Sequence, residues 1–220
     1  MFFDWGTPII HIGDFIMGAF TSLWIAVLVF LLSVLFGTLL ALARFKRRKN
    51  LIFILATVYV EFIRNTPVLV QIFIVYFGLP QFDIHLSPIT AGVLALTVNN
   101  SAYIAEIIRA GIQSIHKGQW EAAASIGLSH FQMFRLIVFP LALRNIFPSL
   151  SNQFIMILFG TSLLSILDVR ELTQRASILN SETFRTMEIF VFVTLMYYVI
   201  SILSSTVLRW VNHKFYPNIK

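Results

Sequence analysis

Long runs of apolar residues limit most strongly what this 220-residue chain can fold into. About 20 helical residues cross the roughly 30 Å hydrocarbon layer of a bilayer, so each mostly apolar run of that length predicts a membrane span. Spans must satisfy their own backbone hydrogen bonds, which favours helices. We therefore predict an all-α integral membrane protein, with one domain over residues 1–220. The five predicted spans are residues 15–43, 51–79, 89–108, 146–167 and 188–210.

Lys and Arg are distributed unevenly between the ends of these spans. None precedes Arg44, which opens a basic block that ends at Lys49. Cytoplasmic loops near span ends carry the excess of Lys and Arg, so we expect the N-terminus outside and, after five spans, the C-terminus in the cytoplasm. The loop 117–140 falls on the cytoplasmic side. Three arginines in an expected outer segment depart from the pattern: Arg170, Arg175 and Arg185.

Composition and missing motifs exclude several functions. The chain has no cysteine and no G-x-x-x-x-G-K-[ST] phosphate loop, and its five histidines are scattered, so we expect no metal, no cofactor and no ATP site in this chain. No catalytic arrangement stands out among the few acidic residues, so we do not expect an enzyme. The net charge of +6 is explained by lipid headgroups beside the spans, not by nucleic acid. The N-terminus lacks the positive region of a signal peptide, so the first span should be retained.

The second span contains ionisable residues and a proline in the sequence "VEFIRNTPVLVQ". Glu61 and Arg64 are three residues apart and so share a helix face, where they are expected to neutralise each other. Pro67 is expected to bend or break the helix because it lacks a backbone donor. Both a structural ion pair and a direct part in transport remain open for Glu61 and Arg64.

Two further spans carry polar groups. In the third span, Asn99, Tyr103 and Glu106 lie on one helix face at i, i+4 and i+7, which favours either a transport pathway or a polar seam between helices. In the fourth span, Gly160 precedes Thr161 and Ser162. These small residues permit a backbone break at a substrate site, although they are also typical of close helix packing.

The cytoplasmic sequence "QWEAAASIGLSHFQMFRLIVFP" differs from the spans around it. Gly127 is expected to end a first helix, and Ser129 to cap a second one. The alanines beside Glu121 offer a shallow surface that suits the groove of another protein. An amphipathic helix lying on lipid is the alternative.

This segment resembles the EAA loop of ABC importer permeases, the coupling helix that enters a cleft in the ATP-binding subunit. The family usually has leucine where this chain has Phe139. The resemblance rests on residues of matching type and spacing: Glu121, Ala122, Ala123, Gly127, Ile137 and Pro140.

Two more blocks, "VEFIRNTPVLVQIFIVYFGLP" and "NNSAYIAEIIRAGIQSIHKGQWEAA", resemble permeases for polar amino acids. The resemblance implies a type I ABC importer fold in the bacterial plasma membrane, with five spans and the coupling helix between the third and fourth. It implies two ATPase subunits that bind ATP and Mg²⁺, a second permease chain (a copy or a paralogue), and an extracytoplasmic amino-acid-binding protein. The expected pathway residues are Glu61, Arg64, Thr66, Pro67, Gln71, Asn99, Tyr103, Glu106, Thr161 and Ser162.

One position departs from these permeases. They commonly carry Lys-Asp before Thr-Ser-Leu, whereas this chain has Phe159 and Gly160. The resemblance then implies either that the substrate is held differently or that this chain is the non-binding half of a heteromeric pair. Two other classes also remain: an ATP-independent channel or ion-coupled carrier, and a non-transporting membrane scaffold.

Overall fold

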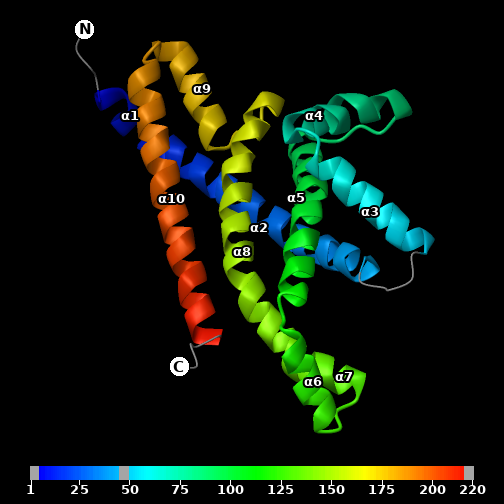
Figure 1. Cartoon of the computed structure of the whole chain (residues 1–220). Helices are drawn as coiled ribbons and strands as arrows, with labels where there is room; N and C mark the ends of the chain where they lie inside the picture. Colours follow the sequence, from blue (N-terminus) through cyan, green and yellow to red (C-terminus); the bar gives the residue numbers. More distant parts are fainter. Residues whose placement is uncertain (1–4, 45–49, 216–220) are drawn as a thin grey trace.

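The computed structural model describes residues 5–44 and 50–215, and every regular element in these residues is helical (Figure 1). The basic residues from Lys46 to Lys49 lie outside the described residues. The α-helices are α1 (Gly6–Ile10), α2 (Ile12–Ala43), α3 (Leu51–Arg64), α4 (Val68–Phe73), α5 (Pro88–Gln113), α6 (Lys117–Ser125), α7 (His130–Met133), α8 (Phe139–Gly160), α9 (Leu172–Thr183) and α10 (Thr186–Phe215). Two π-helical segments (Ile74–Gly78 and Phe134–Val138) and two 3₁₀ helices (Leu79–Phe82 and Thr161–Leu167) complete the described elements.

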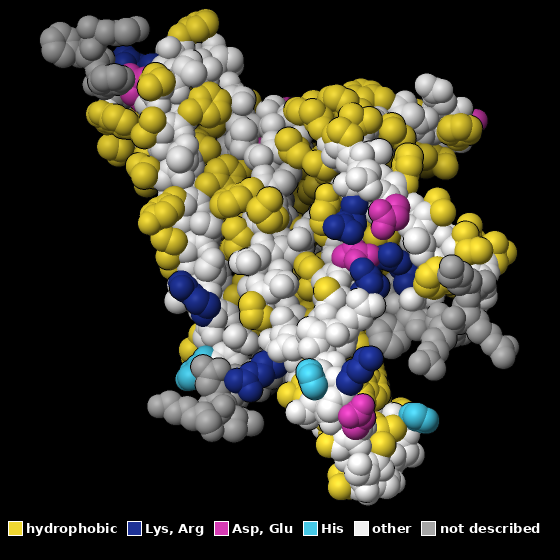
Figure 2. All heavy atoms as spheres, in the orientation of Figure 1, with side chains coloured by type: hydrophobic (Ala, Val, Ile, Leu, Met, Phe, Trp, Pro, Cys, Tyr) yellow, Lys and Arg dark blue, Asp and Glu magenta, His cyan; other side chains and the backbone are white. Residues whose placement is uncertain are grey.

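The membrane-spanning helices confirm the predicted all-α class. Within the described residues, four helical stretches are long and apolar enough to cross a membrane, at 12–43, 88–113, 130–167 and 186–214. A fifth crossing is present if the bent pair α3 and α4 counts as one span. Figure 2 shows apolar side chains over α10 and around α4, whereas charged side chains gather between α3 and α5 and near the lower ends of the helices.

Helix α2 runs obliquely across α5 and α8 (Figure 1) and packs against both and against α9. A stripe of small residues lets these backbones come close, which is the usual basis of helix packing in membranes. A Cβ on Gly37 would lie 2.8 Å from the side chain of Ile104 on α5. The buried small residues of the stripe are Gly18, Ser22, Ala26, Ser33, Gly37 and Ala41.

The second span is bent at Pro67, as predicted. Helix α3 ends at Arg64, α4 begins at Val68, and the two parts meet at 108°. Proline has no backbone N–H, so the carbonyl of Ile63, four residues earlier, loses its usual donor. The buried side chain of Gln71 replaces that donor, because its Nε2 lies 2.9 Å from the Ile63 oxygen. The bend is therefore stabilised by a side chain from the helix that follows it.

The segment 117–138 forms two short helices and a π-helical turn at the lower end of the molecule (Figure 1). Gly127 adopts φ +78° after α6, a left-handed conformation that glycine adopts without a side-chain penalty. Ser129 and Gln132 form a capping box at the start of α7. Both the expected turn and the expected cap are confirmed, and the π-helical turn then continues directly into α8.

The opposite end of the molecule is organised around Glu171, a fully buried carboxylate at the start of α9. It accepts hydrogen bonds from the hydroxyl groups of Ser22 on α2 and Tyr197 on α10. It also accepts from the backbone N–H groups of Thr173 and Gln174. Burial raises the pKa of the Glu171 carboxyl, while these hydrogen bonds act in the opposite direction. One side chain thus joins three helices.

Candidate functional site

A cavity of about 460 Å³ lies between the start of α4, α5 and α8. Every residue that lines it is uncharged. Its polar groups are hydroxyl and amide side chains, so the cavity suits a small polar molecule that requires hydrogen bonds. The lining residues are Thr66, Pro67, Val68, Leu96, Asn99, Asn100, Tyr103, Gln153, Met156, Phe159, Gly160 and Leu163.

The amides of this cavity are held in place by further hydrogen bonds. Asn99 Nδ2 donates to Gln71 Oε1 at 3.1 Å, which ties the cavity wall to the bend at Pro67. On the other wall, Gln153 Nε2 on α8 donates to Asn100 Oδ1 at 2.7 Å. Because each amide already has a partner, its orientation is fixed by the surrounding helices.

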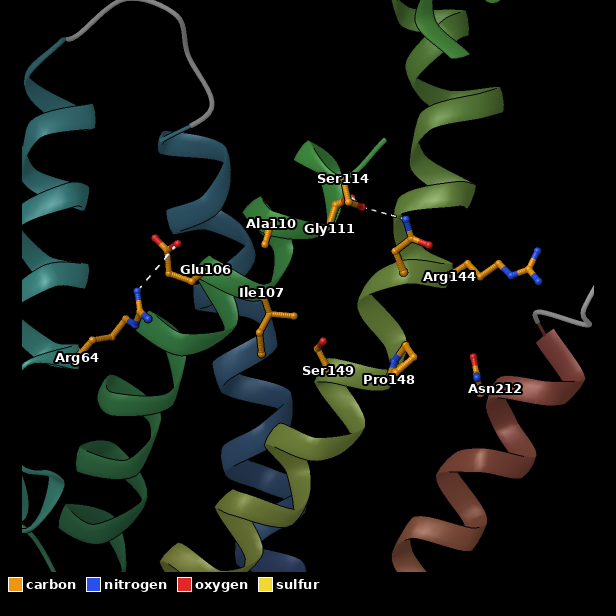
Figure 3. Close-up of a pocket in the computed structure, with 11 residues that line it drawn as sticks. Arg64, Glu106, Ile107, Ala110, Gly111, Ser114, Arg144, Pro148, Ser149 and Asn212 are labelled. Atoms are coloured by element: carbon orange, nitrogen blue, oxygen red, sulfur yellow. Dashed lines mark hydrogen bonds and ion pairs between the residues drawn. The ribbon is translucent and has the colours of Figure 1, made fainter. Parts of the chain in front are cut away.

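A larger cavity of about 880 Å³ lies nearer the segment 117–138 and is lined from α3, α5, α8 and α10 (Figure 3). Figure 3 shows Arg64 directed toward Glu106 on one side and Arg144 and Asn212 on the other. Asn145 on α8 donates to Ser114 at the lower end of α5 at 2.9 Å. The lining residues are Arg64, Glu106, Ile107, Ala110, Gly111, Ser114, Arg144, Asn145, Pro148, Ser149 and Asn212.

The two cavities follow one face of α5 and one face of α8. Residues three or four apart share a helix face, and the lining residues of both cavities recur at this spacing. Tyr103 in the smaller cavity is one turn from Ile107 in the larger one. The shared face of α5 carries Asn100, Tyr103, Ile107, Ala110 and Ser114, and that of α8 carries Asn145, Ser149, Gln153, Met156 and Gly160.

Charge is concentrated beside Tyr103, around Glu106. Arg44 at the end of α2 hydrogen-bonds the Glu106 carboxylate, and Arg109 Nη2 lies 2.7 Å from it. Arg64 is farther away, with its Nη1 at 4.0 Å. The prediction that Glu61 and Arg64 neutralise each other is wrong: among the described residues Arg64 pairs with Glu106, because α3 leans on α5 and brings the two side chains together.

The remaining predicted pathway residues lie in different places. Thr66 and Pro67 line the smaller cavity with Asn99 and Tyr103, whereas Glu106 lines the larger one. Gln71 is a buried brace of the bend and lines neither cavity.

At Gly160 the α-helix continues as a 3₁₀ helix. The hydroxyl of Thr161 donates to the Leu158 carbonyl and that of Ser162 to the Phe159 carbonyl. Neither residue lines either cavity. Asn100, Gln153 and Ser149 do, and the sequence reasoning missed them. Ser149 and Gln153 are polar residues spaced four apart in the fourth span, and this spacing was the available signal for them.

Below the larger cavity, α6 packs against the spans through Trp120, which lies against a buried cluster that includes Ile115, Val138 and Ala142. Ala123 is also buried, whereas Glu121 and Ala122 face outward. Ile137 is half-buried and Pro140 is exposed. Large apolar side chains are exposed at the tip of this segment, namely Ile126, Phe131 and Leu136. An exposed apolar tip is typical of a protein contact.

Comparison with known protein families identifies the family of this chain. The model of the family described as "binding-protein-dependent transport system inner membrane component" matches residues 33–216. The chain belongs to this family. It is a membrane-spanning permease subunit of a transport system and not an enzyme. In the described residues, no group of three His, Cys, Asp or Glu side chains could hold a metal ion.

Individual relatives agree with this assignment. The glutamine transport system permease protein GlnP of Escherichia coli (strain K12) is 38% identical over 211 residues, which cover 95% of this chain and 96% of that protein. The probable glutamine ABC transporter permease protein GlnM of Bacillus subtilis (strain 168) is 43% identical over 67% of this chain and 68% of that protein. A chain in the crystal structure of an amino acid ABC transporter with histidines superposes with a TM-score of 0.91, at 37% identity over 97% of this permease and 100% of that chain.

Proposed function

We propose that this permease forms the translocation pathway of an ATP-driven importer for amino acids. The observation that carries the proposal is the shared face of α5 and α8, along which both the uncharged 460 Å³ cavity and the 880 Å³ cavity above α6 lie. The amides of Asn99, Asn100 and Gln153 match a neutral polar side chain, and the relatives named for glutamine support that substrate class. With Phe159 and Gly160 at its wall, the cavity offers no charged pair there.

A second permease chain, either a copy or a paralogue, is expected to cover this shared face and its polar side chains. Polar side chains at membrane depth face a protein partner or water, since exposing them to lipid is costly. The open face beside α10 also carries Asn152, Ser205 and Arg209, which fits a protein neighbour and not acyl chains. Residues 1–220 then act as one permease domain, and two such domains enclose the path.

The segment 117–140 is expected to dock on an ATPase subunit, one for each permease chain. That partner would bind ATP and Mg²⁺, and an extracytoplasmic binding protein would deliver the amino acid to the other side. The N-terminus is then outside and the C-terminus in the cytoplasm of a bacterial cell. The proposed contact residues are Glu121, Ala122, Ala123, Gly127, Ile137 and Pro140.

The packing of α6 suggests how movement reaches the pathway. Trp120 belongs to the same buried cluster as residues of α5 and α8, and protein interiors move as packed units because they are dense. Closure of the ATPase subunits would displace α6 and shift the lower ends of α5 and α8 together. The cavity would then open to the other side of the membrane, as expected for a two-state bundle biased by its partner.

Affinity purification from mild detergent tests the proposal. The tagged wild-type chain should recover a P-loop ATPase, whereas Glu121→Lys should lose it, because a reversed charge is placed in the docking surface. Glu182→Lys, the same charge reversal at an exposed position of α9 outside this segment, serves as the control and should retain the ATPase. Recovery of the chain without an ATPase in all three preparations would favour a self-sufficient channel or carrier.

A further inference from the structure

Arg64 stands where the two cavities of the permease adjoin. Its guanidinium lines the larger cavity, and its Cζ lies 5.5 Å from the ring centroid of Tyr103, which lines the smaller one. The Tyr103 hydroxyl also donates to the Arg64 backbone carbonyl at 3.4 Å. The arginine is therefore held against the wall of the smaller cavity while it lines the larger one.

Arg64 is also the most weakly paired of the three arginines around Glu106. Glu106 already receives hydrogen bonds from Arg44 and from two nitrogens of Arg109. Arg64 approaches it only to 4.0 Å, and its side chain remains 37% exposed. Three guanidinium groups face Glu106, and counting Glu61, which interacts with Arg109, they still outnumber the carboxylates. The local charge therefore favours an additional anion.

A transported amino acid needs a cationic group to pair with its carboxylate. At neutral pH it carries a carboxylate, and burying that charge without a partner costs several kcal/mol. The smaller cavity provides only uncharged groups. Arginine is suited to the missing role because its planar guanidinium binds a carboxylate through two parallel hydrogen bonds.

We propose that Arg64 binds the α-carboxylate of the amino acid as it leaves the uncharged cavity, releasing its long contact with Glu106 to do so. Arg44 and Arg109 keep Glu106 neutralised during this exchange, so no carboxylate is left without a cation. Tyr103 holds the guanidinium at the junction by stacking. This role rests on the proposed function and adds to it the residue that recognises the charged end of the substrate.

Direct binding to the purified permease–ATPase complex, without the binding protein, tests the role of Arg64. The probes are L-glutamine and L-glutaminamide, in which an uncharged amide replaces the α-carboxylate. The wild-type complex should bind L-glutamine about tenfold more tightly than the amide, as expected for one charge-assisted contact. In Arg64→Gln the two affinities should converge to within about twofold, and Arg64→Lys should restore part of the preference.

Arg185→Gln is the matched control. It removes an arginine whose side chain is 38% exposed and whose Nη1 lies 3.8 Å from the Glu188 carboxylate, but Arg185 lines neither cavity, so the preference for the carboxylate should persist. An unchanged preference in Arg64→Gln, an equal loss in both variants, or no binding to the wild-type complex at millimolar L-glutamine would overturn the role of Arg64. Failure of the complete wild-type importer to accumulate amino acids with ATP would instead overturn the proposed function.

Discussion

Gly111 on α5 lies so close to Ile146 on α8 that a Cβ on residue 111 would be only 2.0 Å from Ile146 Cγ1. This contact lies at the lower end of the two helices whose shared face lines both cavities. It holds their backbones together next to the buried cluster that receives α6, because Ile146 belongs to that cluster. The close approach of α5 and α8 therefore depends on the absence of a side chain at residue 111.

Gly111→Ala should force these helices apart. Overpacking a close contact typically costs about 1–3 kcal/mol, so we expect a lower thermal unfolding temperature in detergent and reduced ATP-dependent uptake. Gly13→Ala is the control, since no atom lies within 4 Å of a Cβ at that position. Equal unfolding temperatures for the two variants would contradict a packing role for Gly111.

Gln71→Leu should destabilise the bend at Pro67. The substitution removes the donor to the Ile63 carbonyl and the acceptor for Asn99, and an unsatisfied buried polar group costs about 1–3 kcal/mol. Denaturant or thermal unfolding measures this loss. Val70→Leu, at an exposed position of the same helix, should unfold like the wild type, and similar behaviour of both variants would argue against a brace.

Gly127→Ala should weaken coupling without disrupting the spans. A Cβ there meets no other atom within 4 Å, but φ +78° disfavours any side chain, at a cost of roughly 1 kcal/mol. We expect ATP hydrolysis by the assembled importer to continue while uptake per ATP falls. Ser125→Ala tests whether any change near the turn has this effect. Unchanged uptake per ATP in Gly127→Ala would count against the proposed role of this segment in coupling.

Glu171→Gln should change how stability depends on pH. Burial holds the pKa of the Glu171 carboxyl above its ordinary value, so folding favours the protonated form. That contribution is complete below the unfolded-state pKa of about 4.3 and is lost as the pH rises through the higher folded-state pKa. A scan of unfolding temperature against pH should therefore fall less steeply over this window in Glu171→Gln than in the wild type. Parallel curves would show that Glu171 does not titrate differently on folding.

Local chemistry made several features of the fold predictable. Pro67 cannot donate to a carbonyl, and Gly127 adopts positive φ without penalty. Ser129 caps a helix because its side chain accepts from the backbone N–H of Gln132, three residues later. Each effect acts within a few residues. The sequence alone is therefore enough to predict the bend, the turn and the cap.

Contacts between distant segments were not predictable in the same way. Glu61 and Arg64 share a helix face, yet Arg64 is turned toward Glu106, which also binds Arg44, 62 residues away in the chain. The hydrogen bond between Asn100 and Gln153 likewise depends on how α5 and α8 pack. With one sequence, periodicity gives the face of each helix but not the helix that it meets.

The π-helical turn at Phe134–Val138 has a consequence for protein engineering. A π-helical turn accommodates one residue more than an α-helical turn, and each residue rotates a helix by about 100°. Deleting a single residue there would be absorbed as the wide turn reverts to regular α-helix, whereas deleting one from α8 would rotate α6 and α7 by that angle relative to the rest of α8. A chimera that exchanges this segment with that of another permease should therefore change length only inside this turn, or the surface proposed to dock on an ATPase will face another way.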